Sequence, residues 1–166
     1  MKPTEQVASD MGCQYIYDEW GRVNLHADRI AMGDTVVVET LPTNGRIDTT
    51  FAPYVRTSRV AIFAFLKHCD LDFDGVEVGE IIDEMLDVAK EYIVRLDATG
   101  AFEPITNLLD FNSVIDFLDA NMAGVRVTLE LKEAQGECVD TTPPSDDDDQ
   151  DEEPTPIEGE GGDDNQ

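Results

Sequence analysis

The sequence is poor in basic residues. Its 166 residues include 11 Lys and Arg against 37 Asp and Glu, and the formal net charge is −26. Proteins that bind nucleic acid or anionic membranes neutralise phosphate groups with clustered Lys and Arg, and this chain has no basic cluster. The composition therefore argues against specific nucleic-acid binding and against a membrane as a partner.

Cysteines and long apolar runs are also scarce. Cys13, Cys69 and Cys138 are far apart and form no CxxC pair, so we expect reduced thiols rather than a disulfide framework. The longest apolar run, Val60 to Leu66, has seven residues, far fewer than a membrane span requires. The first residues lack the apolar core of a signal peptide. These features predict a soluble protein that is present in a cytoplasm.

The chain lacks the common catalytic motifs. No phosphate-binding glycine loop, HExxH or GxSxG sequence is present. His68 and Cys69 are adjacent, and neighbouring residues of a strand point to opposite faces, which makes them a poor base and nucleophile pair. His26 lies in a polar segment without a partner motif. We therefore expect no catalytic residues, no cofactor and no enzymatic activity.

One acidic loop is a weak candidate for a metal site. Asp70, Asp72 and Asp74, followed by Gly75, match the first half of a calcium-binding loop. The second half does not match, because Ile81 occupies the position of the bidentate Glu. The alternative is an acidic strand-to-helix loop whose carboxylates stabilise the N-terminus of the following helix.

The negative charge is unevenly distributed. Residues 141–166 contain 11 acidic and no basic side chains, whereas residues 1–140 contain 26 acidic and 11 basic ones, a net charge of −15. After Gly136 the sequence loses its apolar pattern and becomes rich in Pro, Gly and acids. We therefore predict a domain at residues 1–138 and a disordered acidic tail at 139–166. The tail could increase solubility, bind a basic partner, or mimic or repel nucleic acid.

Apolar periodicity predicts the elements of the domain. The clearest helix covers residues 76–96, and a short helix is expected at 4–11 with Thr4 as its N-cap. Strands are predicted at residues 14–17, 35–41, 59–67 and 124–132, the last with strict alternation of apolar and polar residues. Residues 107–118 fit a strand better than a helix.

A turn and the order of these elements indicate the fold class. Asn44-Gly45 is a typical hairpin turn and predicts pairing of residues 35–41 with a strand at 47–51. Residues 59–67 are apolar at every position but the two ends, which predicts a central strand covered on both faces. The sequence thus predicts an α+β fold, with one mainly antiparallel sheet, the long helix packed on a face, a short N-terminal helix and the acidic C-terminal tail.

Several stretches between Val36 and Cys138 have a familiar order. They are VVVETLPTNGR, VAIFAFLKHCDLDFDG, EIIDEMLDVAKEYIVRL, FEP and DFLDANMAGVRVTLELKE, with GEC after the last one. This pattern resembles tail terminator and tail completion proteins of tailed bacteriophages and prophages of the Bacteroidales type. The acidic tail is not part of the resemblance.

The resemblance implies a structural role without catalytic residues. Such proteins form rings, commonly hexamers, at the head-proximal end of the tail. We would then expect self-association in a ring, contacts with tail-tube and neck or connector proteins, and passage of DNA without specific binding. The expected location is the virion tail or neck, and the host cytoplasm during assembly. The alternative function is an acidic adaptor or nucleic-acid mimic that binds a basic partner.

Overall fold

The chain folds into a mixed α+β structure, as the sequence predicts. The computed structural model describes residues 1–19, 21–23, 29–51, 53–69, 75–106, 109–117 and 121–138. The elements in chain order are α1 (Pro3–Asp10), β1 (Gln14–Asp18), β2 (Thr35–Thr40), β3 (Gly45–Phe51), β4 (Tyr54–His68), α2 (Gly75–Ala98), β5 (Phe111–Phe117), β6 (Met122–Lys132) and β7 (Glu137–Cys138). The predicted acidic tail, residues 139–166, lies outside the described residues.

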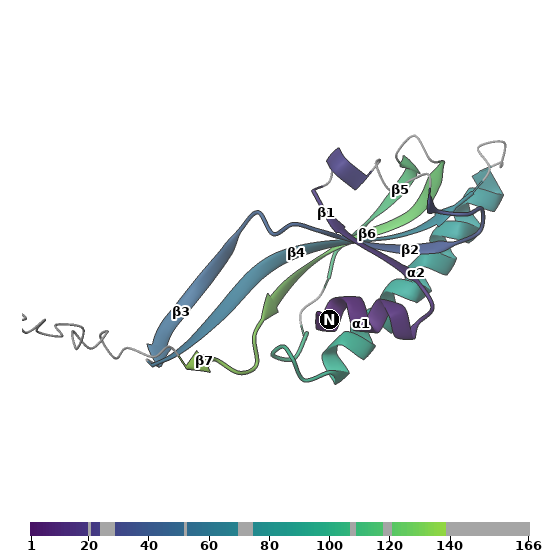
Figure 1. Cartoon of the computed structure of the whole chain (residues 1–166). Helices are drawn as coiled ribbons and strands as arrows, with labels where there is room; N and C mark the ends of the chain where they lie inside the picture. Colours follow the sequence, from purple (N-terminus) through teal and green to yellow (C-terminus); the bar gives the residue numbers. More distant parts are fainter. Residues whose placement is uncertain are drawn as a thin grey trace, which may run out of the picture.

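A single seven-stranded sheet forms the framework, and β4 is its central strand (Figure 1). The strand order is β1-β2-β4-β6-β5, and β3 and β7 also pair with β4. Within the described residues, β1 and β2 are the only parallel neighbours, and the other strand pairings are antiparallel. The prediction of a mainly antiparallel sheet is therefore confirmed.

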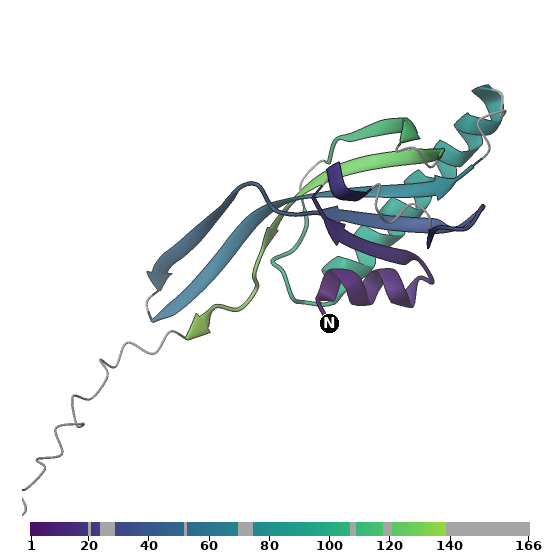
Figure 2. The same cartoon turned by 45° about the horizontal axis from the view of Figure 1, so that its top comes forward.

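Helix α2 packs across one face of the sheet (Figures 1 and 2). Its buried residues recur at the three- and four-residue steps that the sequence predicts: Ile81, Met85, Ala89, Tyr92 and Leu96. The Tyr92 ring lies between two rings of β4, with centroid distances of 5.4 Å to Phe63 and 5.2 Å to Phe65. This aromatic cluster forms the centre of the main core.

The opposite face of the sheet has a smaller core. Ala64 and Leu66 of β4 face this side, together with Val36 and Val38 of β2, and Val23 and Ile30 cover them. Because β4 contributes buried residues to both cores, its continuous apolar sequence is explained by coverage on both faces. The prediction of a central strand is confirmed, and the strand extends five residues further towards the N-terminus than expected.

The two strands after α2 also agree with the sequence. In β6 the apolar residues Val125, Val127, Leu129 and Leu131 are buried, while Thr128, Glu130 and Lys132 are exposed. Residues 111–117 form the edge strand β5, so the strand interpretation of that ambiguous segment is confirmed.

The predicted cap of α1 is wrong. The N-cap is Lys2, Pro3 is the first helical residue, and Thr4 is inside the helix and fully buried. Proline suits this first position because it has no N–H group to leave unpaired. The Thr4 hydroxyl lies 3.1 Å from the Tyr15 hydroxyl instead of capping the helix.

The predicted hairpin at Asn44-Gly45 is also wrong. Both β2 and β3 pair antiparallel with β4, β2 with its second half and β3 with its first half, so they continue in one direction along it. Val60 N–H donates to Asn44 O at 3.0 Å, and a Cβ on Gly45 would lie 2.8 Å from Ser58 O. Asn44-Gly45 therefore allows the chain to approach β4 closely instead of forming a hairpin turn. The chain reverses between Phe51 and Tyr54, which pair with each other.

Candidate functional site: the β3–β4 arm and its root

The first half of β4 and the whole of β3 form a ribbon that projects from the body. We call residues 44–59 the arm. Figures 1 and 2 show it extending beyond the sheet, away from α2, with β7 beside its far end. None of the arm side chains that the structure describes is buried, and Ile47 and Tyr54 are 72% and 55% exposed. The arm is therefore a long element without a core of its own.

Local contacts hold the arm together. The Thr50 hydroxyl and the Thr50 N–H both donate to the Asp48 carboxylate, at 2.5 and 2.9 Å, and these bonds lower the pKa of Asp48. Arg56 donates to Glu103 at 3.0 Å, and β7 pairs with Tyr54 and Val55. An isolated two-stranded ribbon is only marginally stable in water, and these exposed contacts add little to it.

The charge of the arm differs from that of the body. The arm contains three arginines, Arg46, Arg56 and Arg59, and one acid, Asp48. The rest of residues 1–138 contains 8 basic and 24 acidic side chains, a net charge of −16. The formal charge of the arm is therefore opposite in sign to that of the body, and two of its three arginines are paired with acids of the body, Arg56 with Glu103 and Arg59 with Glu39.

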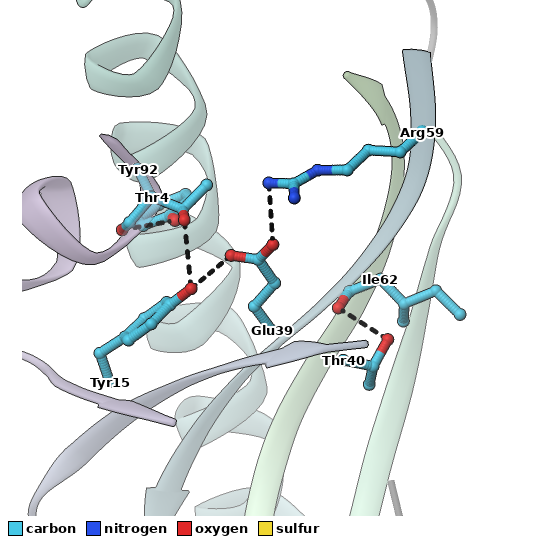
Figure 3. A network of polar contacts seen from close by, with 7 residues as sticks. All are labelled: Thr4, Tyr15, Glu39, Thr40, Arg59, Ile62 and Tyr92. Atoms are coloured by element: carbon cyan, nitrogen blue, oxygen red, sulfur yellow. Dashed lines mark hydrogen bonds and ion pairs between the residues drawn. The ribbon is translucent and has the colours of Figure 1, made fainter. Parts of the chain in front are cut away.

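A buried ion pair fixes the root of the arm (Figure 3). Arg59, the last arm residue, donates through Nη2 to Glu39 Oε1 at 3.2 Å. The Glu39 side chain is 1% exposed and that of Arg59 is 25% exposed. Glu39 belongs to β2, where both faces of the sheet are covered, so its charge lies inside the protein.

A chain of hydroxyl groups connects this ion pair to both helices (Figure 3). The Tyr15 hydroxyl of β1 donates to Glu39 Oε2. Tyr15 also contacts the Thr4 hydroxyl, and the Tyr92 hydroxyl of α2 donates to Thr4 O at 2.9 Å. Burial raises the pKa of both tyrosines, with smaller contributions from Glu39, so both rings keep their protons at neutral pH.

The network leaves no polar group unpaired. Among the described residues, no buried side-chain nitrogen or oxygen lacks a hydrogen-bond partner. A buried carboxylate costs several kcal/mol of desolvation unless it is paired and hydrogen-bonded, as Glu39 is. Strands β1, β2 and β4 and helices α1 and α2 all contribute, so the direction of the arm is tied to the body.

The outer face of α2 is strongly acidic. The helix contains seven acidic residues and two basic ones. Its solvent side carries Glu80, Asp83 and Asp87 between two exposed valines, Val76 and Val94, which are 69% and 68% exposed. Asp87 pairs with Lys90 at 2.7 Å, whereas no described residue forms a salt bridge with Glu80 or Asp83.

The candidate residues from the sequence are only partly tested. Asp70, Asp72 and Asp74 lie outside the described residues, as does His26, so the metal site stays a prediction. In the described part of the chain, no three His, Cys, Asp or Glu side chains are grouped as metal ligands would be.

His68 and Cys69 contact different parts of the chain. His68 Nδ1 lies 3.1 Å from Ile30 O, and the Cys69 thiol donates to Asn121 O at 3.1 Å. Both side chains therefore link loops to the sheet, and the two are engaged separately.

Sequence analysis missed Glu39 and Arg59. The signal was present, because Glu39 is a lone charge in the apolar strand TVVVET. A charge at such a position requires a partner of opposite sign. Which of the 11 basic residues supplies it depends on the register of β2 and β4, and the mistaken hairpin gave the wrong register.

The described part of the chain contains no helix with the length and apolarity that crossing a bilayer requires. No family model, curated protein or solved structure matches this chain.

Proposed function

We propose that the protein is a structural subunit of a bacteriophage virion. In this proposal it forms a homo-oligomeric ring, commonly a hexamer in the proteins it resembles, at the head-proximal end of the tail. The ring completes the tail, contacts the tail tube and the neck, and lets DNA pass. The observation that carries the proposal is the arm, a long exposed ribbon without a core.

The arm supports self-association for an energetic reason. A ribbon of two strands needs a third layer or another chain to become firmly ordered. Here the arm extends away from the body (Figure 2), and none of its described side chains is buried, which leaves the ribbon accessible to another molecule. A surface patch that binds a different patch on a second copy generates a ring when the rotation closes.

The charge of the body supports passage of DNA. Residues 1–140 have a net charge of −15. A channel lined by acidic side chains repels phosphates, so DNA can move through it without being held. An oligomer of this chain would concentrate that charge around the channel.

The resemblance provides the link to phage tails. Its matching stretches form β2, β4, α2 and β6, the elements that make the main core. The acidic adaptor remains the alternative, and the predicted tail at residues 139–166 is the segment it would depend on.

Electron microscopy and mass photometry test the proposal. We expect the purified full-length protein at micromolar concentration to form closed rings of uniform size, and a variant ending at Cys138 to form the same rings. Antibody labelling should mark the neck of phage particles. Monomers alone, with or without tail-tube protein, would contradict the ring. Capture of a basic DNA-binding protein that is lost on removal of residues 139–166 would favour the adaptor.

A further inference from the structure

We infer that the arm of one copy docks on the outer face of α2 of the next copy. This inference rests on the proposed ring and names the two surfaces that build it. The donor surface is the arm, with Arg46, Arg56 and the exposed Ile47 and Tyr54. The acceptor surface is the acidic stripe of α2, defined by Val76, Glu80, Asp83, Asp87 and Val94.

Charge complementarity selects these two surfaces. Arg59 is paired with the buried Glu39 and Arg56 with Glu103, so Arg46 is the exposed arginine of the arm with which no described residue forms a salt bridge, whereas α2 alone carries seven acids against two bases. Two copies of so acidic a body repel each other through most surface pairings. Contact between the arm and α2 is a pairing in which opposite charges meet, and it therefore favours a specific orientation.

The apolar side chains agree with the same pairing. Ile47 and Tyr54 on the arm are exposed by more than half, and so are Val76 and Val94 at the two ends of the acidic stripe. Contact between these residues would remove apolar side chains from water, which favours association. On α2 the acidic residues lie at the centre of the proposed contact, and the two valines lie at its ends.

The geometry also fits. Since the arm points away from α2 of its own copy (Figures 1 and 2), the contact is made between molecules. Donor and acceptor are different patches, so the contact is head-to-tail and builds a ring when the rotation between neighbouring copies closes.

Charge reversal on each surface tests the inference. Arg46 is exposed, and no described residue forms a salt bridge with it, so Arg46→Glu should leave the fold intact. The same holds for the double variant Glu80→Arg/Asp83→Arg on α2. We expect each variant alone to assemble only at a concentration at least about tenfold higher than the natural chain, by mass photometry. Circular dichroism verifies that each variant is folded.

Mixing the two variants gives the decisive result. The acidic arm of the first variant matches the basic helix of the second, and the two unchanged surfaces match each other. An equimolar mixture should therefore regain rings in which the variants alternate. Arg22→Glu serves as the control, because Arg22 lies outside both surfaces and its side chain is 63% exposed; rings should persist.

Each failure has a separate meaning. Rings that persist in both charge-reversal variants, or a mixture that stays monomeric, would overturn the docking of the arm on α2 and leave the ring itself standing. A natural chain that is monomeric under all conditions would overturn the ring and the docking together.

Discussion

The buried ion pair at the root of the arm makes a sharp prediction about stability. Replacing Arg59 by Met keeps an unbranched apolar stem and removes the charge that neutralises Glu39. Glu39 is 1% exposed and would retain only the hydrogen bond from Tyr15. Breaking a buried pair by removal of one partner costs roughly 3–5 kcal/mol.

The exposure of Arg59 places the cost at the lower end of that range. Its side chain is 25% exposed, so water can approach the site and partly replace the guanidinium. We therefore expect Arg59→Met to lose about 3 kcal/mol of unfolding free energy. For a domain of this size the melting temperature should fall by roughly 10 °C. Urea denaturation followed by circular dichroism, at one fixed protein concentration, measures the loss.

Two further variants separate charge burial from a general effect of substitution. Arg22→Met removes an exposed arginine that lies 3.8 Å from Asp18, and it should change stability by less than about 0.5 kcal/mol. Glu39→Met/Arg59→Met removes both charges, and we expect it to be more stable than Arg59→Met alone. If Arg59→Met unfolds at the same urea concentration as Arg22→Met, the ion pair does not hold the root, and the reasoning is wrong.

Further predictions concern the sheet, the helix and one thiol. Gly124→Ala should lower the free energy of unfolding by about 3 kcal/mol, because the new Cβ would lie 2.0 Å from Phe65 O between β4 and β6. In α2 a Cβ on Gly79 meets nothing within 4 Å, so Gly79→Ala should raise the free energy of unfolding by roughly 0.5–1 kcal/mol. Equal urea midpoints for the two variants would contradict this. Burial, together with the charge of Glu91, raises the pKa of the Cys13 thiol, so its thiolate is scarce at pH 8 and forms only as the pH rises further. Iodoacetamide should modify Cys13 slowly at pH 8, as followed by peptide mass spectrometry, and Glu91→Gln should accelerate the modification; an unchanged rate would exclude Glu91 as a cause.

The sequence was sufficient for the body of the fold. The long helix and the strands at 59–67 and 124–132 were predictable because each buries a face against neighbours, and burial leaves an apolar period in the sequence. The apolar residues of 107–118 fit both a helical and a strand period, and pairing with β6 determines that a strand forms. Where an element buries one face along its whole length, its apolar pattern is therefore sufficient to predict the element.

The arm could not be predicted in this way. None of its described side chains is buried, so no apolar period indicates which strand pairs with which. Asn44-Gly45 is a strong local turn signal. In this structure, however, the missing side chain of Gly45 lets β3 approach β4 closely at Ser58. When a local motif fits two structures, residues far away in the sequence determine which one forms. Here β4 is long enough to pair with β2 and β3 in succession.

The network at the root links the fold to the proposed assembly. Arg59 is both the last residue of the arm and the partner of Glu39, and Glu39 is connected through Tyr15 and Thr4 to both helices. The root therefore fixes the angle between the arm and α2 within one copy. If the arm of each copy docks on α2 of the next, that angle sets the rotation between neighbours, and the rotation sets the number of subunits that close a ring. Variants that loosen the root should then broaden the distribution of ring sizes, whereas variants of the docking surfaces should reduce assembly.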